Sequence, residues 1–203
     1  KYRDILVSVK KLVEKGEAQQ VVISRTFSRE TKANPLQIWS ALKSINPSPY
    51  LFIFKTPDFS LFGSSPEKMV NVKNRTIEVA VLGGSHPKDK SKSIQEQEEE
   101  LLHDLKEVAE HNMKMETAKH DAASLVQPGS LQTLELRGFR LFSHIGHIIS
   151  RFGGKLKDEL DAVDALRIVL PSATITGFPK QKAMEIIDRY EENKREIYGG
   201  ALC

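Results

Sequence analysis

The sequence predicts an α/β fold of the α+β type, in which large antiparallel β-sheets are flanked by helices. Four strand-like segments follow one another at hairpin spacing between residues 50 and 82, and strands joined in this way pair antiparallel. Segments with a helical spacing of apolar residues lie on both sides of them. The 203 residues, 39% of them hydrophobic, suffice for a substantial core and leave open one large domain or two small ones.

The chain before residue 50 is expected to form two helices and one strand. Apolar residues recur on one face of residues 1–17, and Gly16 marks the end of that helix. The β-branched run of residues 20–27 predicts a strand. A second helix is expected over residues 34–45, and the two prolines of residues 46–49 predict the turn that follows it.

Four strands and a loop are expected next. The strand-like segments are residues 50–55, 59–63, 68–73 and 76–82, which together read as a meander. The two glycines of residues 83–88 then predict a loop, because glycine lets the backbone approach a neighbour closely. His86 and Lys88 beside these glycines favour an anion site as much as a plain turn.

The longest helical pattern covers residues 95–125 and contains a candidate metal site. Glu107 and Glu110 are three residues apart, so they share one face of that helix. Such a pair can hold a hard divalent cation, whereas most acidic pairs on helices are only solvated. From the residues alone, both interpretations stay open.

Two further strands are expected at residues 131–138 and 143–152. The second contains His144 and His147, which are three residues apart and on a strand would point to opposite faces. Only one of them can then face a given cleft. Histidine is the usual general acid–base, although strand histidines are more often packed or exposed.

The last quarter of the chain predicts a turn, two helices and a hydroxyl-rich stretch between them. Gly153-Gly154 is the expected turn, and residues 158–170 form the first helix. Pro179 suits the first position of the second helix, with Thr176 or Gly177 as its N-cap. The N-terminus of that helix could receive an anion, or it could be an ordinary capped surface helix.

Composition argues against two classes of partner. The net charge of +3 is too small, and the basic residues too interspersed with acidic ones, for nucleic-acid binding. No apolar run approaches the roughly 18 residues of a membrane span, and no signal peptide opens the chain. The single cysteine, Cys203, excludes an internal disulfide and fits a reducing compartment. We therefore expect a soluble, cytoplasmic protein.

Seven motifs resemble the chorismate-utilising enzymes, most closely the large component of anthranilate synthase. In collinear order they are GEAQQVVISR, NPSPY, GSSPE, ELLHDLKEVAEH, SHIGHIIS, PSATITGFPKQKAMEIID and YGGA. The resemblance runs from about Tyr2 to the last residue. It implies one domain over residues 1–203 with the chorismate-binding enzyme fold, incomplete at both ends relative to the family.

The resemblance also implies a magnesium-dependent site for chorismate. The catalytic positions are His147 and Thr174, the substrate-binding positions Gly84, Ser85, Thr174 and Tyr198, and the magnesium positions Glu107 and Glu110. In the family the histidine lies near the departing ring hydroxyl. The NPSPY motif further resembles part of a tryptophan inhibitor site, which would place Asn46, Pro49, Tyr50 and Leu51 beside a bound tryptophan.

The implied reaction is of the anthranilate synthase type. Gln20 and Gly83 stand where isochorismate-forming and aminodeoxychorismate-forming relatives carry lysines. Anthranilate-type enzymes convert chorismate and ammonia to anthranilate and pyruvate, with ammonia released from glutamine by an amidotransferase partner. Two alternatives stay open: an aminodeoxychorismate synthase-like enzyme, or an incompetent homologue that acts as a scaffold or ligand-binding module. Phe178 replaces a usual alanine, and in segment 116–121 only Asp121 is retained, which is why the second alternative stays open.

Overall fold

The structure is a computed structural model that describes all residues from 1 to 203. In chain order the helices are α1 (Tyr2–Glu14), α2 (Pro35–Ile45), α3 (Ile94–His103), α4 (Leu105–Leu125), α5 (Ala162–Val169), α6 (Ala173–Thr176) and α7 (Lys180–Tyr190). The strands are β1 (Gln20–Val21), β2 (Tyr50–Lys55), β3 (Ser60–Ser65), β4 (Val70–Lys73), β5 (Thr76–Pro87), β6 (Gln132–Leu141), β7 (Ile145–Lys155) and β8 (Gly177–Phe178). No helix is at once long and apolar enough to cross a lipid bilayer.

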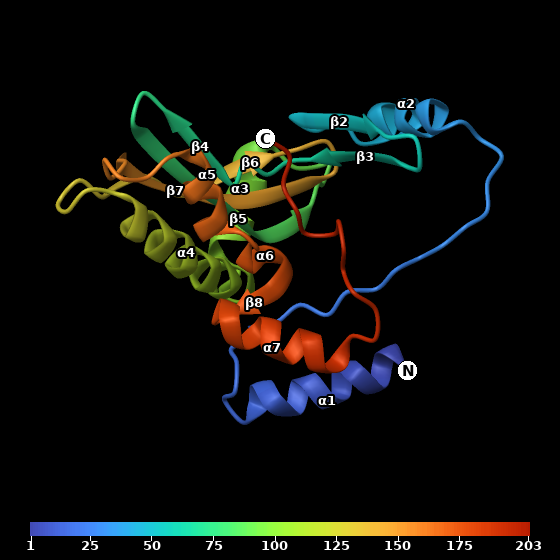
Figure 1. Ribbon diagram of the computed structural model, residues 1–203, viewed down its shortest axis with the longest axis horizontal. Helices are drawn as coiled ribbons and strands as arrows, with labels where there is room; N and C mark the ends of the chain where they lie inside the picture. The colour runs from blue at the N-terminus through green and yellow to red at the C-terminus, as the bar shows by residue number, and fades with distance from the viewer.

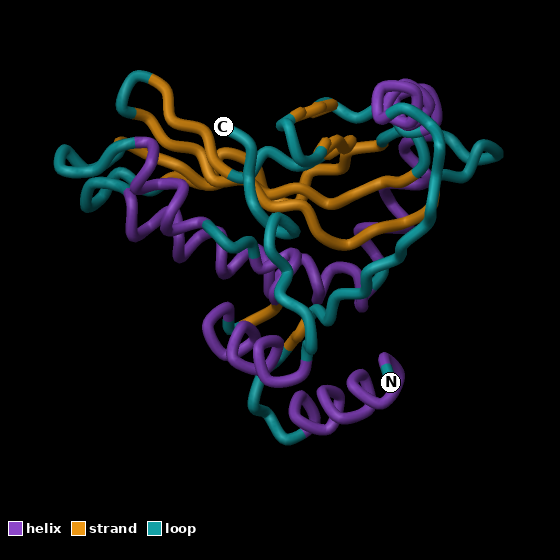
Figure 2. The backbone as a smooth tube through the Cα atoms, turned by 45° about the vertical axis from the view of Figure 1, so that its right-hand side comes forward, coloured by secondary structure: helices purple, strands orange, loops and turns teal.

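A four-stranded antiparallel sheet with the strand order β4-β5-β7-β6 forms the centre of the molecule. The long helix α4 runs across one face of this sheet (Figure 1). A second unit, the hairpin β2-β3 with helix α2, lies at one end, and a third unit, the β1-β8 pair with α1 and α7, lies below. The tube view separates these three parts (Figure 2). The predicted fold class, antiparallel sheets flanked by helices, is confirmed.

Strand β5 contains a β-bulge, at which the strand comes close to helix α4. It pairs with β7 along its length, from Thr76 opposite Lys155 to Pro87 opposite Ile145, and the register shifts between Gly83 and Ser85. At the bulge Gly84 has a φ of 65°. A Cβ on Gly84 would lie 2.9 Å from the carbonyl oxygen of Glu107 in α4. Glycine therefore supplies both the backbone conformation and the close approach of strand and helix.

The largest core cluster lies between the central sheet and α4. Ala118, Ala122 and Leu125 of α4 pack against Ile77 of β5 and Phe152 of β7, all within a cluster of 11 buried residues. The alanines let the helix come close to the sheet, and the larger side chains fill the space between them. This packing fixes the second half of α4 against the central sheet.

A smaller cluster of five buried residues holds the unit below the sheet together. Val9 of α1 meets Ile186 and Ile187 of α7, with Ala18 and Ile23 from the connecting segment. The two amphipathic helices thus bury their apolar faces against each other, as their residue spacing predicts.

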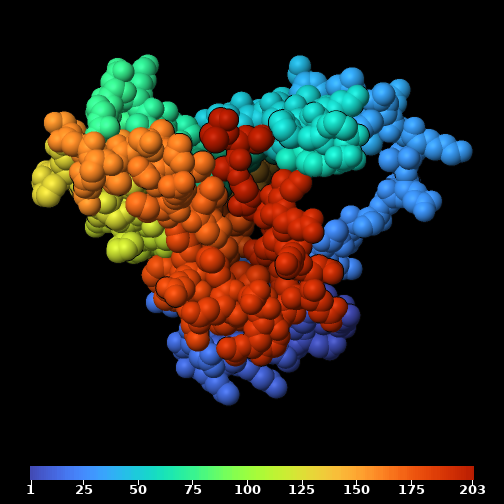
Figure 3. Space-filling model, viewed as in Figure 1, coloured from blue at the N-terminus to red at the C-terminus, as the bar shows by residue number.

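The unit of α2 and the β2-β3 hairpin has no such core. Helix α2 contains no buried residue, and the predicted four-stranded meander is wrong because β3 does not pair with β4. Residues 25–34, which are exposed and contain no helix or strand, lead to α2 and stand away from the rest of the surface (Figure 3). The hairpin and the central sheet are therefore separate sheets.

The predicted strand over residues 20–27 is much shorter than expected. Only Gln20 and Val21 pair, because their partner β8 is itself two residues long. Beyond them, Val22 N–H still donates to the Thr176 carbonyl at 2.9 Å. Side chains bond the backbone after that: Ser24 N–H donates to Glu191 at 2.6 Å, and Arg195 donates to the Val22 carbonyl at 2.6 Å. β-branched residues favour a strand only where a partner strand is present.

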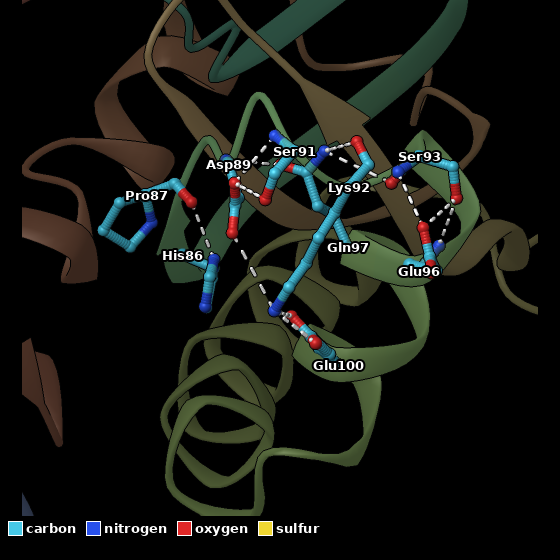
Figure 4. A network of polar contacts seen from close by, with 9 residues as sticks. All are labelled: His86, Pro87, Asp89, Ser91, Lys92, Ser93, Glu96, Gln97 and Glu100. Carbon is cyan, nitrogen blue, oxygen red and sulfur yellow. Dashed lines mark hydrogen bonds and ion pairs between the residues drawn. The ribbon is translucent and has the colours of Figure 1, made fainter.

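The helix predicted over residues 95–125 is broken at Asp104. That residue has an extended backbone, and its carboxylate accepts from the N–H groups of Lys106 and Glu107 as the N-cap of α4. Helix α3 has its own start, a capping box between Ser93 and Glu96, within the polar network of Figure 4. In that network the buried Gln97 accepts from Asp89 N–H at 2.9 Å. An aspartate inside a helical pattern can therefore begin a new helix.

Two segments that were predicted as a loop and a turn lie within strands. The expected loop of residues 83–88 is mostly strand, since β5 continues through the bulge to Pro87. The expected turn at Gly153-Gly154 lies inside β7. Gly153 is needed there because a Cβ would collide with the carbonyl oxygen of Ile77. These glycines serve close approach of backbones and not turns.

The start of α7 and the stretch before it also differ from expectation. Pro179 is the N-cap and not the first helical residue, and no side chain caps this helix. Thr176 instead ends the single helical turn α6, whose own N-cap is Ser172. Helix α5 begins at Ala162 and not near residue 158, because Asp161 caps it. For α5 and α6, a local carboxylate or hydroxyl decides which residue begins the helix.

Candidate active site

The residues singled out by the sequence meet around the bulge of β5. Glu107, in the first turn of α4, accepts a hydrogen bond from the Ser85 N–H at 2.7 Å. His147 of β7 lies opposite Ser85 in the strand register, and its Nδ1 is 3.2 Å from the Gly84 carbonyl oxygen. Three segments far apart in the sequence, α4, β5 and β7, therefore meet at Gly84 and Ser85.

Glu107 is held as a carboxylate. Partial burial raises its pKa, but the Ser85 N–H and the ammonium of Lys106 outweigh this and bring the pKa below the ordinary glutamate value. Lys106 lies 3.0 Å from Glu107 Oε1 and is largely exposed. The Oε1 atom is thus free to exchange its partner, while the backbone bond fixes the orientation of the group.

Glu110 is paired with a buried lysine. Lys114, one turn further along α4, places its Nζ 2.6 Å from Glu110 Oε1, and its side chain is only 8% exposed. The stem of Lys114 passes over Gly83, where a Cβ would lie 2.9 Å from Lys114 Cδ. The absence of a side chain at position 83 therefore makes room for the lysine.

His147 is a neutral imidazole with a defined tautomer. The Gly84 carbonyl can only accept, so Nδ1 carries the proton and Nε2 keeps its lone pair. Burial lowers the pKa of His147; the Gly84 carbonyl and Glu110 act in the opposite direction, and the charge of Lys114 lowers the pKa further. Nε2 can therefore take up a proton and, once protonated, is a strong acid toward a leaving oxygen.

Thr174 lies in α6 and contacts a glutamate that residue spacing did not single out. Its hydroxyl donates to Glu67 Oε1 at 3.3 Å. Burial raises the pKa of Glu67, and the Thr174 hydroxyl, the charge of Lys114 and the Leu82 N–H offset only part of this effect. Glu67 belongs to the GSSPE motif, and the motif was the available signal.

A second residue missed from the sequence, His111, lies beneath the site. It is completely buried, and its Nε2 is 2.8 Å from Ser150 Oγ of β7. Burial, followed by the charges of Lys114 and Arg137, lowers the pKa of His111 to about 4. The residue is therefore neutral at physiological pH and ties α4 to the central sheet.

The other predicted site residues lie apart from the bulge. His144 is exposed and precedes β7, so it and His147 do not point to opposite faces of one strand, as the sequence predicted. Tyr198 is 54% exposed and stacks near the Arg195 guanidinium, 5.6 Å from its ring centre. Arg195 also donates to the Ile175 carbonyl, which places the Tyr198 turn beside α6 and Thr174.

The predicted tryptophan residues lie near the opposite face of the central sheet. Pro49 and Tyr50 line a cavity of about 280 Å³, whose other lining residues include Leu82, Arg140 and Arg151. Leu51 is not part of this lining. The Asn46 amide oxygen accepts from Ser143 Oγ at 3.2 Å, which links the NPSPY turn to the segment before β7.

The glutamate pair fits magnesium in its donor chemistry. Magnesium takes oxygen ligands, usually one or two carboxylates, and keeps waters or substrate oxygens for the rest of its shell. Glu107 offers Oε1 once the exposed Lys106 moves aside, and Glu110 Oε2 accepts no hydrogen bond. No group of three His, Cys, Asp or Glu side chains is assembled here, so waters and substrate oxygens would have to complete the shell.

Comparison with known proteins identifies the family of the chain. The family model for chorismate binding enzymes matches residues 1–203. The chain is 37% identical over 202 residues to anthranilate synthase component 1 of Pseudomonas putida, covering 99% of the chain and 41% of that protein. It is 40% identical over 202 residues to the chloroplastic anthranilate synthase alpha subunit 2 of Arabidopsis thaliana, covering 99% of the chain and 32% of that protein.

A solved structure shows the same fold. Anthranilate synthase component I from Streptococcus pneumoniae TIGR4 superposes with a TM-score of 0.87 at 32% identity, over 98% of this chain and 44% of that one. The chain spans about two fifths of the length of the Pseudomonas putida relative, 41%. The family model, in contrast, covers every residue of the chain. The chain therefore belongs to the family of chorismate-binding enzymes.

Proposed function

We propose that this chain carries the chorismate site of an anthranilate synthase-type lyase, in which chorismate and ammonia give anthranilate, pyruvate and water. The observation that carries the proposal is the contact of Glu107 and His147 with the two adjacent bulge residues Ser85 and Gly84, at 2.7 and 3.2 Å. The names of the relatives support the reaction type. The reaction adds nitrogen to the ring, removes a ring hydroxyl as water, and then eliminates pyruvate.

Each residue has a role that its chemistry allows. His147 exchanges a proton through Nε2 with the departing hydroxyl, because Nδ1 is held by the Gly84 carbonyl. The Thr174 hydroxyl donates to Glu67 and keeps its lone pairs to accept from substrate. Glu107 and Glu110 would hold the magnesium ion, which supplies positive charge for the substrate carboxylates when bound.

The finer parts of the proposal rest on the family. We propose a glutamine amidotransferase as the source of ammonia, and tryptophan as an inhibitor at the cavity lined by Pro49 and Tyr50. Asn46 begins the NPSPY motif and Leu51 directly follows it. Tyr198 is proposed to meet a substrate carboxylate. The single cysteine, Cys203, is free and exposed, in keeping with the reducing cytoplasm as the proposed compartment.

One observation bears on the aminodeoxychorismate alternative. A side chain at position 83 would meet Lys114 Cδ at 2.9 Å and His111 Cα at 3.3 Å, counting only its Cβ. The lysine that such relatives carry at this position has no room while Lys114 is in place. We therefore favour the anthranilate-type reaction over this alternative.

Product analysis after incubation with chorismate, magnesium and excess ammonium tests the proposal. We expect anthranilate above the level without protein, and a 10²- to 10⁴-fold loss in a His147→Ala variant, the usual range for a general acid–base. His144→Ala is the matched control, since it removes an exposed histidine three residues away. Absence of anthranilate with the folded chain, or equal activity in the two variants, would contradict the proposal and favour a ligand-binding homologue.

A further inference from the structure

Lys114 stands out among the residues around the site. It is a lysine with only 7% of its surface exposed, although lysine is almost never fully buried unless it is paired. Its one ion pair is to Glu110, at 2.6 Å. The proposed reaction assigns it no role, so its burial next to a proposed metal ligand calls for an explanation.

The surroundings of Lys114 hold it in this position. Its stem lies over Gly83 of β5, 2.9 Å from where a Cβ would be, so the strand leaves room for it only by lacking a side chain. Its charge reaches the ionisable groups of the site, namely Glu67, Glu110, His111 and His147. Asp121, in the same small cavity, is already paired with Lys180 at 3.3 Å. Glu110 is therefore the carboxylate that pairs with the Lys114 ammonium.

We propose that the Lys114 ammonium is a resident cation of the site, which neutralises Glu110 and weakens the binding of a divalent metal by that carboxylate. The inference rests on the proposed function, because it assumes that Glu110 is a metal ligand. A cation bound at Glu110 would lie close to the ammonium, and like charges at such separations in a partly buried site repel strongly. To move away from a cation bound at Glu110, the ammonium would have to give up its buried position.

The expected consequence is a metal affinity set by Lys114. Removing its charge frees Glu110 and tightens metal binding at least tenfold, a factor that corresponds to about 1.4 kcal/mol. Keeping the charge, as in Lys114→Arg, leaves the affinity near that of the wild type. The direction of the change in metal affinity distinguishes the proposal from general damage to the site. Damage caused by losing a buried polar residue would weaken metal binding instead.

The test measures binding of Mg²⁺ by calorimetry and of Mn²⁺ by the spin-resonance signal of the free ion, without substrate. The variants are Lys114→Met, Lys114→Arg and Lys119→Met, the last removing an exposed lysine of the same helix as a matched control. We expect tighter binding in Lys114→Met alone. Circular dichroism and urea denaturation check the fold, and Lys114→Gln replaces the methionine variant, with the same expectation, if that variant does not fold.

Adding Glu110→Gln to Lys114→Met distinguishes the resident-cation proposal from the assignment of Glu110 as a metal ligand. Loss of the tightened binding in Lys114→Met with Glu110→Gln would show that the metal binds at Glu110 and that Lys114 opposes it. Binding in Lys114→Met that is no tighter than in the wild type, including no binding in either, would overturn the resident-cation proposal. Tight binding that survives Glu110→Gln would overturn the assignment of Glu110 as metal ligand, and the resident-cation proposal with it.

Discussion

The central sheet with α4 and the unit of α2 with the β2-β3 hairpin are built from equally clear sequence patterns, yet only the first has a core. Ile77, Leu125 and Phe152 are at most 2% exposed in the first region. In the second, Ile45 is 67% and Phe54 52% exposed, and α2 has no buried residue. Apolar periodicity therefore predicts that an element forms, whereas burial depends on what lies against it.

The largest expected effect tests the difference in packing. Phe152→Ala removes a ring from the core cluster and should lower the free energy of unfolding by about 3–5 kcal/mol, through lost burial and the cavity it leaves. Phe54→Ala in the hairpin should cost less than about 1 kcal/mol. Urea denaturation measures both. Similar losses for the two variants would mean that the hairpin is as tightly packed as the sheet.

The next effect is a pH dependence confined to the packed region. His111 has its pKa lowered to about 4 in the folded state, against 6.5 for the ordinary side chain, mainly by burial. Between these values the unfolded chain binds more protons, so stability is complete above pH 6.5 and falls as the pH drops toward 4, by up to about 3 kcal/mol.

Variants of two histidines check the source of this pH dependence. His111→Gln keeps a group that can bond to Ser150 but cannot gain a proton, so the difference in unfolding free energy between pH 7 and pH 4.5 should shrink. His144→Gln, at an exposed position, should leave the difference unchanged. An unchanged pH profile in His111→Gln would assign the effect to other groups.

A smaller effect concerns the site that the packed region positions. Glu110→Gln should weaken magnesium-dependent binding of chorismate at least tenfold, about 1.4 kcal/mol, because an amide is a poor ligand for a hard cation. Glu116→Gln, exposed on the same helix, is the control. Calorimetry with chorismate, with and without magnesium, gives both affinities. Equal binding by the two variants would remove Glu110 from the site.

The smallest effect compares two helix caps across the regions. Asn34 accepts from Leu36 N–H at 2.9 Å at the start of α2, and Ser93 occupies the same position in α3. Each change to alanine should cost about 1 kcal/mol locally. Hydrogen exchange should show faster exchange in α2 without a change in the melting temperature, whereas Ser93→Ala should also lower the melting temperature, because α3 carries the buried Leu101. A lowered melting temperature in Asn34→Ala would show that α2 is coupled to the core.

The sequence predicted which helices and strands form more accurately than it predicted where they begin and end. The helices at residues 2–14 and 35–45 and the hairpin strand at residues 50–55 follow from periodicity, prolines and caps, all of which act locally. The break at Asp104 and the strand through Gly153 were missed for one reason: a capping aspartate and a glycine each have two common uses. Only the neighbouring backbone selects between these uses.

By itself the sequence determined the fold class, the family and the residue types of the site, because motifs and periodicities are properties of the chain. Tertiary structure alone decided that Gly84 and Ser85 lie on a bulge that touches both Glu107 and His147. The sequence could not assign Lys114 to the interior, since its burial depends on the missing side chain of Gly83, on a strand 31 residues earlier. Burial and charge pairing arise between segments that pack together, and packing is settled only when the whole chain folds.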